Sequence, residues 1–243
     1  WLSSFIYFWM RKSFYGKFGH IHCPSEFIAE QLRKHHYRAK LHVISNGVTE
    51  EFQFEHRPKT DALFHILMIG RLSPEKRQDL LIKAAKQSKY SDRLQLHFAG
   101  TGPSEQSLKK QGASLSHPPI FGYYQKEKLL QLIHSSDLYV HTSDAEIEAI
   151  ACLEAVACGL VPVISNSRKS ATSQFALDSR STFLAGDASD LARKIDYWIE
   201  HPEEKHRMAE EYVKSTEPYR IEHSVEKAEQ MFAEVLKDTG KKG

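Results

Sequence analysis

The sequence predicts an α/β fold whose larger part is a doubly wound parallel sheet. From residue 62 to residue 217, short apolar segments alternate with segments of helical periodicity. This alternation is typical of β–α–β units, in which helices cover both faces of a buried parallel sheet. Apolar residues make up 41% and charged residues 26% of the 243 residues, which excludes a disordered chain.

Residues 1–48 are predicted to be the C-terminal portion of a truncated N-terminal domain. The chain has no initiator Met, and its apolar start lacks the charged region and cleavage site of a signal peptide, so we interpret it as a cut through a larger protein. The expected elements are a helix, a strand, a second helix capped by Ser25 and a second strand, at 3–18, 20–25, 25–36 and 41–45. The polar residues 49–62 form a predicted linker.

Residues 63–217 are predicted to be a second domain, and residues 218–243 a helix that packs back toward the first domain and ends in a disordered tail. Strands are expected in the apolar segments at 64–70, 94–100, 119–122, 137–143 and 161–165. Helices are expected between and after them, at 74–88, 103–112, 126–136, 149–159 and 190–202. No stretch approaches the ~18 uncharged apolar residues of a membrane span.

Charge and cysteine content exclude several classes of protein. The net charge of +2 lacks the basic excess of a nucleic-acid-binding protein. Cys23, Cys152 and Cys158 are too few and too scattered for a disulfide framework or a zinc cluster, and they fit a reducing cytoplasm. We therefore expect no nucleic-acid partner, no bound metal and no cofactor.

Three strand ends carry candidate functional residues, because ligands of an open parallel sheet bind outside the carboxyl ends of its strands. The first is GRLSPEKR (70–77). Ser73 and Pro74 suit the start of a helix, which would place Lys76 in its first turn, where a cation is favourable only if an anion binds. Arg71 can bind phosphate oxygens through two N–H groups. Arg71, Lys76 and the helix N-terminus are a candidate diphosphate clamp, and a solvated basic turn is the alternative.

The second strand end is Gly100-Thr101-Gly102-Pro103. Its glycines would allow a ligand to approach the backbone closely. The full G-x-G-x-x-G pattern of dinucleotide sites is absent, so these residues taken alone predict a tight turn.

The third strand end precedes the apolar helix predicted at 149–159, in which Glu154 is the one charged residue. A carboxylate on such a helix is costly unless it is hydrogen-bonded, and no Lys or Arg lies three or four residues away. We expect Glu154 to be buried and to face the crevice, with a partner elsewhere in the fold or on a ligand such as a sugar hydroxyl. Glu146 can face the same crevice, and Glu148 is expected in the first turn of the helix.

The motif E-x7-E followed by Gly-Leu-Val-Pro-Val-Ile resembles the family 4 (group 1) glycosyltransferases, which are retaining enzymes of the GT-B fold. The resemblance covers nearly the whole chain. It extends through NGV, GRLSPEK, GTGP, FGYY, DLYVHTSDAE and LEAVACGLVPVIS. It implies that residues 63–217 bind a nucleotide-diphosphate sugar and that residues 1–48 end an acceptor-binding domain.

The resemblance also implies roles for individual residues. Arg71 and Lys76 would bind the diphosphate, Glu146 the hydroxyls of the donor sugar, and Glu154 the ribose, while the backbone near Gly122 would hold the base. The catalytic residues are thus expected to be Arg71, Lys76 and Glu146. The donor-binding residues are expected to be Gly70, Gly100, Gly102, Gly122, Tyr123, Glu148 and Glu154. The family usually has E-G-F or E-G-x where this chain has Glu146-Ile147-Glu148, which leaves the donor sugar open.

The Glu-Ile-Glu variant and NSRKSATSQFALD (within 165–178) resemble a bacterial subgroup that glucosylates diacylglycerol. The first eighteen residues hold eight aromatics together with Arg11, Lys12 and Lys17, a composition that suits a lipid headgroup interface. The alternative is a helix in the core of the N-terminal domain, which the apolar character of residues 1–10 on all sides favours.

We therefore expect a retaining hexosyltransferase that moves a hexose from UDP-glucose or a similar donor to a membrane lipid such as diacylglycerol. The protein would be cytoplasmic and peripheral on the inner face of the cell membrane. One alternative is a sugar acceptor in capsule or cell-wall glycan assembly. Others are a nucleotide-sugar 2-epimerase and a non-catalytic nucleotide-sugar-binding module.

Overall fold

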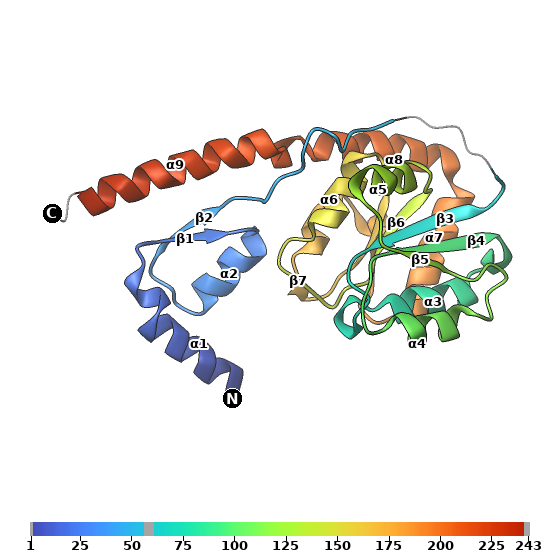
Figure 1. The fold of residues 1–243 in the computed structure, drawn as a ribbon, viewed down its shortest axis with the longest axis horizontal. Coiled ribbons are helices and arrows are strands. Elements are labelled where there is room, and N and C mark those ends of the chain that lie inside the picture. The colour runs from blue at the N-terminus through green and yellow to red at the C-terminus, as the bar shows by residue number, and fades with distance from the viewer. Residues whose placement is uncertain (1, 56–60, 241–243) are drawn as a thin grey trace. The chain divides into compact units, whose positions relative to one another are not determined.

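The computed structural model describes the backbone of residues 2–55 and 61–240 (Figure 1). Side chains are described over the same ranges, except those of residues 2–4, 7 and 11. Parts of three expectations lie outside the described residues: the middle of the linker (56–60), the C-terminal tail (241–243), and Trp1 with the side chains of Tyr7 and Arg11.

The chain divides into two compact units. The smaller unit combines residues 1–47 with residues 218–243, and the larger unit is formed by residues 48–217. The two ends of the chain therefore belong to one unit, and the continuous segment between them forms the other.

The described part of the smaller unit contains a two-stranded parallel sheet and three α-helices. The strands are β1 (His20–Cys23) and β2 (Lys40–Val43), and the helices are α1 (Leu2–Ser13), α2 (Glu26–Lys34) and α9 (Ile221–Gly240). Ser25 caps α2 as predicted, because its Oγ accepts a hydrogen bond from the Ile28 N–H at 3.4 Å. The first predicted helix is too long, since a 3₁₀ turn at Tyr15–Lys17 follows α1 and contains Gly16, a poor helix former.

The larger unit is built on a six-stranded parallel sheet with the order β10-β8-β6-β3-β4-β5. Its strands are β3 (Phe64–Ile69), β4 (Leu94–Ala99), β5 (Ile120–Gly122), β6 (Leu138–His141), β8 (Pro162–Ser165) and β10 (Thr182–Phe183). The five predicted strands are confirmed. The two-residue strand β10 was missed, as was a separate parallel pair, β7 (Ala145–Glu146) with β9 (Lys169–Ser170), because two residues carry no hydrophobic period.

Helices cover both faces of this sheet. They are α3 (Gln78–Gln87), α4 (Glu105–Gly112), α5 (Lys126–His134), α6 (Ile150–Ala157), α7 (Ala188–Glu200) and α8 (Pro202–Ser215). Figure 1 shows α3 and α4 on one face and α5 and α6 on the other. Leu67 and Phe98 in the central strands and Trp198 in α7 are at most 1% exposed, which places the core between the sheet and its helices.

The helix predicted at 74–88 begins later than expected, at Gln78. Pro74–Lys76 form a 3₁₀ turn, and Arg77 has a left-handed backbone with φ 55°. The Ser73 side chain does not cap a helix; its Oγ donates to Glu75 Oε1 at 2.5 Å instead. The prediction that Lys76 lies in the first turn of an α-helix is therefore wrong.

Gly100 lies where the ends of β3 and β4 come close together, and a substitution there tests how restrictive this approach is. Its φ is 153°, and a Cβ at this position would lie 2.1 Å from Gly70 O. Gly100→Ala is expected to lower the free energy of unfolding by about 3 kcal/mol or more, because backbone strain and overpacking add. Gly186 is the matched control, since it has φ 82° but a Cβ added there would meet no atom within 4 Å.

Urea unfolding of the two variants measures this difference. Gly186→Ala should cost only the strain of a left-handed alanine, about 1 kcal/mol. Equal losses for both variants would show that the contact between the two strand ends is not restrictive.

Candidate functional site at the carboxyl edge of the sheet

A cavity of about 500 Å³ opens at the carboxyl edge of the sheet, where β3 and β4 end. The two backbones stay paired beyond the strands, because the Gly70 N–H donates to Ala99 O and the Leu72 N–H donates to Thr101 O, each at 2.9 Å. Glycine at this edge leaves backbone accessible from the cavity. The site residues predicted from the sequence that line the cavity are Gly70, Arg71, Gly100, Gly102 and Tyr123.

Gly122 and Tyr123 follow β5 at the same edge. The Gly122 carbonyl accepts a hydrogen bond from the Gly100 N–H at 2.7 Å, so it is used within the sheet. The Tyr123 side chain is 73% exposed and leaves its ring face available to a planar group. A role of this backbone in holding a base stays a prediction.

Arg71 lies at the cavity with an exposed side chain. Its backbone is anchored, because the buried Gln78 donates from Nε2 to Arg71 O at 2.8 Å. The guanidinium has no hydrogen-bond or ion-pair partner among the residues that the structure describes. An unpaired guanidinium beside a cavity can bind two phosphate oxygens at once.

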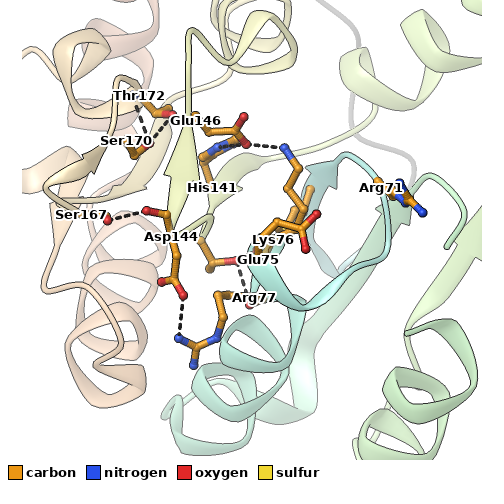
Figure 2. Close-up of polar contacts among 12 residues, drawn as sticks. Arg71, Glu75, Lys76, Arg77, His141, Asp144, Glu146, Ser167, Ser170 and Thr172 are labelled. Carbon is orange, nitrogen blue, oxygen red and sulfur yellow. Dashed lines mark hydrogen bonds and ion pairs between the residues drawn. The ribbon is translucent and has the colours of Figure 1, made fainter. Parts of the chain in front are cut away.

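Lys76 binds Glu146, although the sequence predicted that it would form a clamp with Arg71. Lys76 Nζ lies 2.5 Å from Glu146 Oε1, and His141 Nε2 lies 3.1 Å from the same oxygen. Figure 2 shows Arg71 apart from these three side chains. Lys76 and Glu146 do not line the cavity, but the Lys76 side chain passes beside Gly70, which does; a Cβ at Gly70 would meet Lys76 Cε at 3.8 Å.

The environment of Glu146 keeps its carboxylate ionised. Burial would raise the pKa of Glu146, but the hydrogen bonds from His141 and Lys76, and their charges, lower it to about 2. His141 is 2% exposed and Lys76 is half-buried, so water screens the pair only in part. The alternative of a solvated basic turn does not describe Lys76.

Thr142 holds the turn of Lys76 against the end of β6. Its Oγ1 lies 2.8 Å from both Lys76 O and Arg77 O, so one hydroxyl hydrogen is shared between two carbonyls. The Asp144 N–H donates to Glu75 O at 2.9 Å, and Arg77 Nη1 lies 3.4 Å from Asp144 Oδ2 (Figure 2). These contacts occupy carbonyls that a regular helix would have used, which explains why α3 starts at Gln78.

The backbone of Glu146 is held by a short parallel ladder. In β7 and β9, Glu146 is paired with Ser170, and the Ala171 N–H donates to Glu146 O at 3.0 Å. Ser170 Oγ and Thr172 Oγ1 lie 3.0 Å apart behind this ladder (Figure 2). The carboxylate therefore projects from a supported strand.

Two residues with strained backbone, Arg77 and Ala149, lie beside segments that carry site residues. Among the described residues, positive φ angles outside glycine occur at His36, Arg77 and Ala149. Arg77 follows the Lys76 turn, and Ala149 precedes α6 with φ 68°. Each left-handed non-glycine residue costs about 1–2 kcal/mol, a cost that clusters at functional sites.

The other two predicted carboxylates differ from expectation. Glu148 does not lie in the first turn of α6, which begins at Ile150; it lies before the helix and is 2% exposed. Glu154 is half-buried, although the sequence predicted that it would be buried. Burial raises the pKa of Glu154 to about 7, against the opposing charge of Lys126 at the start of α5. Their roles in donor binding stay predictions.

The sequence analysis missed His141, Thr142 and Asp144. One signal was available, because a histidine and a threonine end an otherwise apolar strand, LYVHT, at the carboxyl edge. Polar residues buried there must be hydrogen-bonded within the fold or to a ligand.

Two family models match the chain. The model described as "Glycosyl transferases group 1" matches residues 48–215, and that described as "Glycosyltransferase Family 4" matches residues 1–52. The first match covers most of the larger unit, including every site residue described above.

Individual relatives agree with these matches. The chain is 28% identical over 163 residues to the alpha-monoglucosyldiacylglycerol synthase of Streptococcus pneumoniae. The aligned region is 59% of this chain and 36% of the synthase, so the chain spans about a third of the length of that relative. The catalytic domain of the cholesterol-alpha-glucosyltransferase from Helicobacter pylori is 46% identical, with a TM-score of 0.60 over 64% of this chain and 99% of that one. The pneumococcal O-GlcNAc transferase shares the fold, with a TM-score of 0.79 at 17% identity over 95% of this chain and 47% of that one.

Glu154 provides a test through its pKa. Because the pKa is raised from 4.5 to about 7 in the folded chain, the folded state binds the proton more tightly, and stability falls as pH rises through this window. Glu154→Gln removes this loss. The variant should therefore gain about 2 kcal/mol of stability relative to the parent between pH 5 and pH 8.

Urea unfolding of both proteins at the two pH values measures this gain. Glu127→Gln, which removes an exposed carboxylate from α5, is the control and should show no such change. A stability difference between Glu154→Gln and the parent that does not vary with pH would contradict the raised pKa.

Proposed function

The chain belongs to the group 1 glycosyl transferases, and we propose on that basis that it moves a hexose from a nucleotide-diphosphate sugar to the hydroxyl group of a membrane lipid. Family membership and the parallel sheet confirm the fold class predicted from the sequence, α/β of the GT-B type. The nature of the donor, the stereochemical course and the acceptor are parts of the proposal.

The observation that carries the donor proposal is the unpaired guanidinium of Arg71 beside the glycine-lined cavity. A diphosphate placed there would meet a cation that has no existing ion pair to give up. The cation, and not the backbone, carries this proposal, because the Gly70 and Gly100 N–H groups already donate to Ala99 O and Gly122 O. Preorganised charge of this kind also stabilises the negative charge that develops on a departing diphosphate.

Lys76 would contribute differently from Arg71. It is already neutralised by Glu146, so binding a phosphate requires it to leave or share this partner. Glu146 would then be free to accept a hydrogen bond from a sugar hydroxyl, while His141 keeps its carboxylate oriented. The ion pair between Lys76 and Glu146 would then be replaced by a contact of Lys76 with phosphate and a contact of Glu146 with the sugar.

We propose a substitution with retention of configuration. The bond between the sugar C1 and the diphosphate oxygen breaks, the acceptor oxygen bonds to C1 on the same face, and the acceptor proton passes to the departing phosphate. Glu146 is held by two donors at a pKa of about 2, which suits a binding group better than a nucleophile. The names of the two glucosyl relatives specify alpha products, which supports retention if the donor sugar is alpha-linked.

The acceptor proposal rests on those relatives and on α1. One is named for a glucosyl diacylglycerol and the other for glucosylating cholesterol, and both lipids present a hydroxyl at a membrane surface. In α1, Phe5 and Trp9 are 64% and 59% exposed, with Lys12 on the same helix. No helix in the described part of the chain is long and apolar enough to cross a membrane.

Calorimetric titration of the chain with UDP, GDP and ADP, and with the corresponding nucleosides, tests the donor proposal. Arg71→Ala is expected to weaken diphosphate binding by about 3 kcal/mol and Lys76→Ala by about 1.5 kcal/mol, because only Lys76 must give up an existing ion pair. Neither substitution should change nucleoside binding.

Lys83→Ala is the matched control, since it removes an exposed lysine of α3 that pairs with Asp79 away from the cavity. Equal losses for diphosphate and nucleoside would show that Arg71 and Lys76 do not contact phosphate. A hexose isomer released without any acceptor would favour an epimerase over a transferase.

Liposome flotation tests the membrane proposal. Replacing Lys12 and Lys17 by Gln should lower partitioning onto anionic vesicles at low salt by about 2 kcal/mol, since each cation near the surface contributes about 1 kcal/mol. The difference should fade as salt screens the attraction.

The control replaces two lysines of α3, Lys83 and Lys86, by Gln, which makes the same change in net charge. If both pairs lower partitioning equally, the attraction comes from net charge alone. If neither pair of substitutions lowers partitioning, and the Lys12 and Lys17 variant has a lower melting temperature, α1 belongs to a domain core. The membrane proposal then loses the support of this helix.

A further inference from the structure

A cluster of metal-ligating side chains lies in the smaller unit. His20 on β1, His42 on β2 and Glu234 on α9 each offer a ligand atom, and these atoms lie within 4.8 Å of one another. The described part of the chain holds no second group of this kind. We propose that His20, His42 and Glu234 bind one divalent transition-metal ion of the Zn²⁺ type, which links α9 to the sheet of β1 and β2.

The separations fit ligands that need only a small adjustment. Tetrahedral Zn²⁺ with bonds of roughly 2.0–2.1 Å places its ligand atoms about 3.3 Å apart. His20 Nδ1 and His42 Nε2 are 2.9 Å apart, and His42 Nε2 and Glu234 Oε2 are 3.9 Å apart. The two distances lie on either side of the required value, and the ligand atoms of His20 and Glu234 lie within 4.8 Å of each other. Shifts of the rings and the carboxylate by about an ångström would admit the ion, which would replace the hydrogen bond between the two imidazoles.

Asp238 supports the same assignment independently. It lies one helical turn beyond Glu234, and its Oδ2 lies 3.0 Å from His20 Nε2, the ring nitrogen that does not face His42. A carboxylate that accepts the second N–H of a histidine fixes the tautomer in which the first nitrogen can bind a metal. His20 is therefore oriented as the histidines of metal sites are.

The environment is half-buried and holds one competing cation. The side chains of His20 and His42 are 9% and 11% exposed, whereas Glu234 is 43% exposed, which leaves room for water as a further ligand. Lys40 Nζ binds Glu234 Oε2, so a metal must share or displace this lysine. Two imidazoles and one carboxylate are ligands that suit Zn²⁺ and its neighbours in the first transition row.

The ion would act as a cross-link. Its ligands come from β1, β2 and α9, and so from both ends of the chain, which meet in this unit. Without the metal, the polar contacts described between α9 and the strands include the exposed Lys40–Glu234 ion pair, which contributes little, and the contact of His20 with Asp238. A bound metal would attach the C-terminal helix to the two strands much more firmly, and this role is independent of the proposed transferase activity.

Equilibrium dialysis of the full chain against micromolar ZnCl₂, followed by metal analysis, tests the proposal. We expect one Zn²⁺ per chain, a higher melting temperature than in EDTA, and slower hydrogen exchange in α9. His42→Gln and Glu234→Gln should each lower the affinity more than tenfold, and Asp238→Asn about tenfold. Lys40→Gln should raise it, because the competing cation is gone.

Two variants serve as controls. Glu229→Gln removes an exposed carboxylate from the same helix, and His206→Gln removes an exposed histidine from the larger unit. Neither should change the affinity, and circular dichroism in EDTA shows that each variant is folded. The proposal is overturned if the chain binds no Zn²⁺ saturably, or if the His42 and Glu234 variants bind it as well as these controls do.

Discussion

The hydroxyl of Thr142 shares its hydrogen between the carbonyls of Lys76 and Arg77, and the arrangement of the site depends on this contact. Thr142 directly follows β6 and is 1% exposed, so the bond forms away from competing water. It draws the residues after β3 toward the end of β6, which lies beside β3 in the sheet. Lys76 can reach Glu146 because its backbone is held there, and α3 begins only after this turn.

Two carboxylates that the sequence predicted for the site, Glu146 and Glu154, differ in pKa because their surroundings differ. Glu146 receives hydrogen bonds from Lys76 and His141, which lower its pKa to about 2 despite burial. Glu154 is also partly buried but has only the charge of Lys126 to offset burial, and its pKa rises to about 7. Near neutral pH the first is an obligate acceptor, whereas the second can carry a proton. Pairs of acids divided in this way commonly take different roles in one site.

Sequence patterns predicted the elements whose formation depends on residues close together in the chain. The strands at 64–69 and 94–99 were predicted because they are apolar runs ended by Gly70 and Gly100. The start of α3 was missed because a partner 66 residues away, Thr142, determines it. The pairing of β7 with β9 was missed because two residues are too few to show a period. The proposed metal site of His20, His42 and Glu234 could not be predicted from sequence spacing, because these residues meet only in the folded chain.

The ion pair of Lys76 also determines how a donor could be recognised. In the free chain, Lys76 and Glu146 neutralise each other, and the unpaired cation at the cavity is Arg71 among the residues described. A lone phosphate could bind Arg71 without disturbing Glu146. A ligand that carries both a diphosphate and a sugar can compensate for the broken ion pair, because its phosphate would take Lys76 while its hydroxyls donate to Glu146. Sharing Lys76 with a phosphate alone weakens its contact with a half-buried carboxylate, which offsets part of the gain. In the proposed donor complex, the pair would thus favour an intact nucleotide sugar over its fragments.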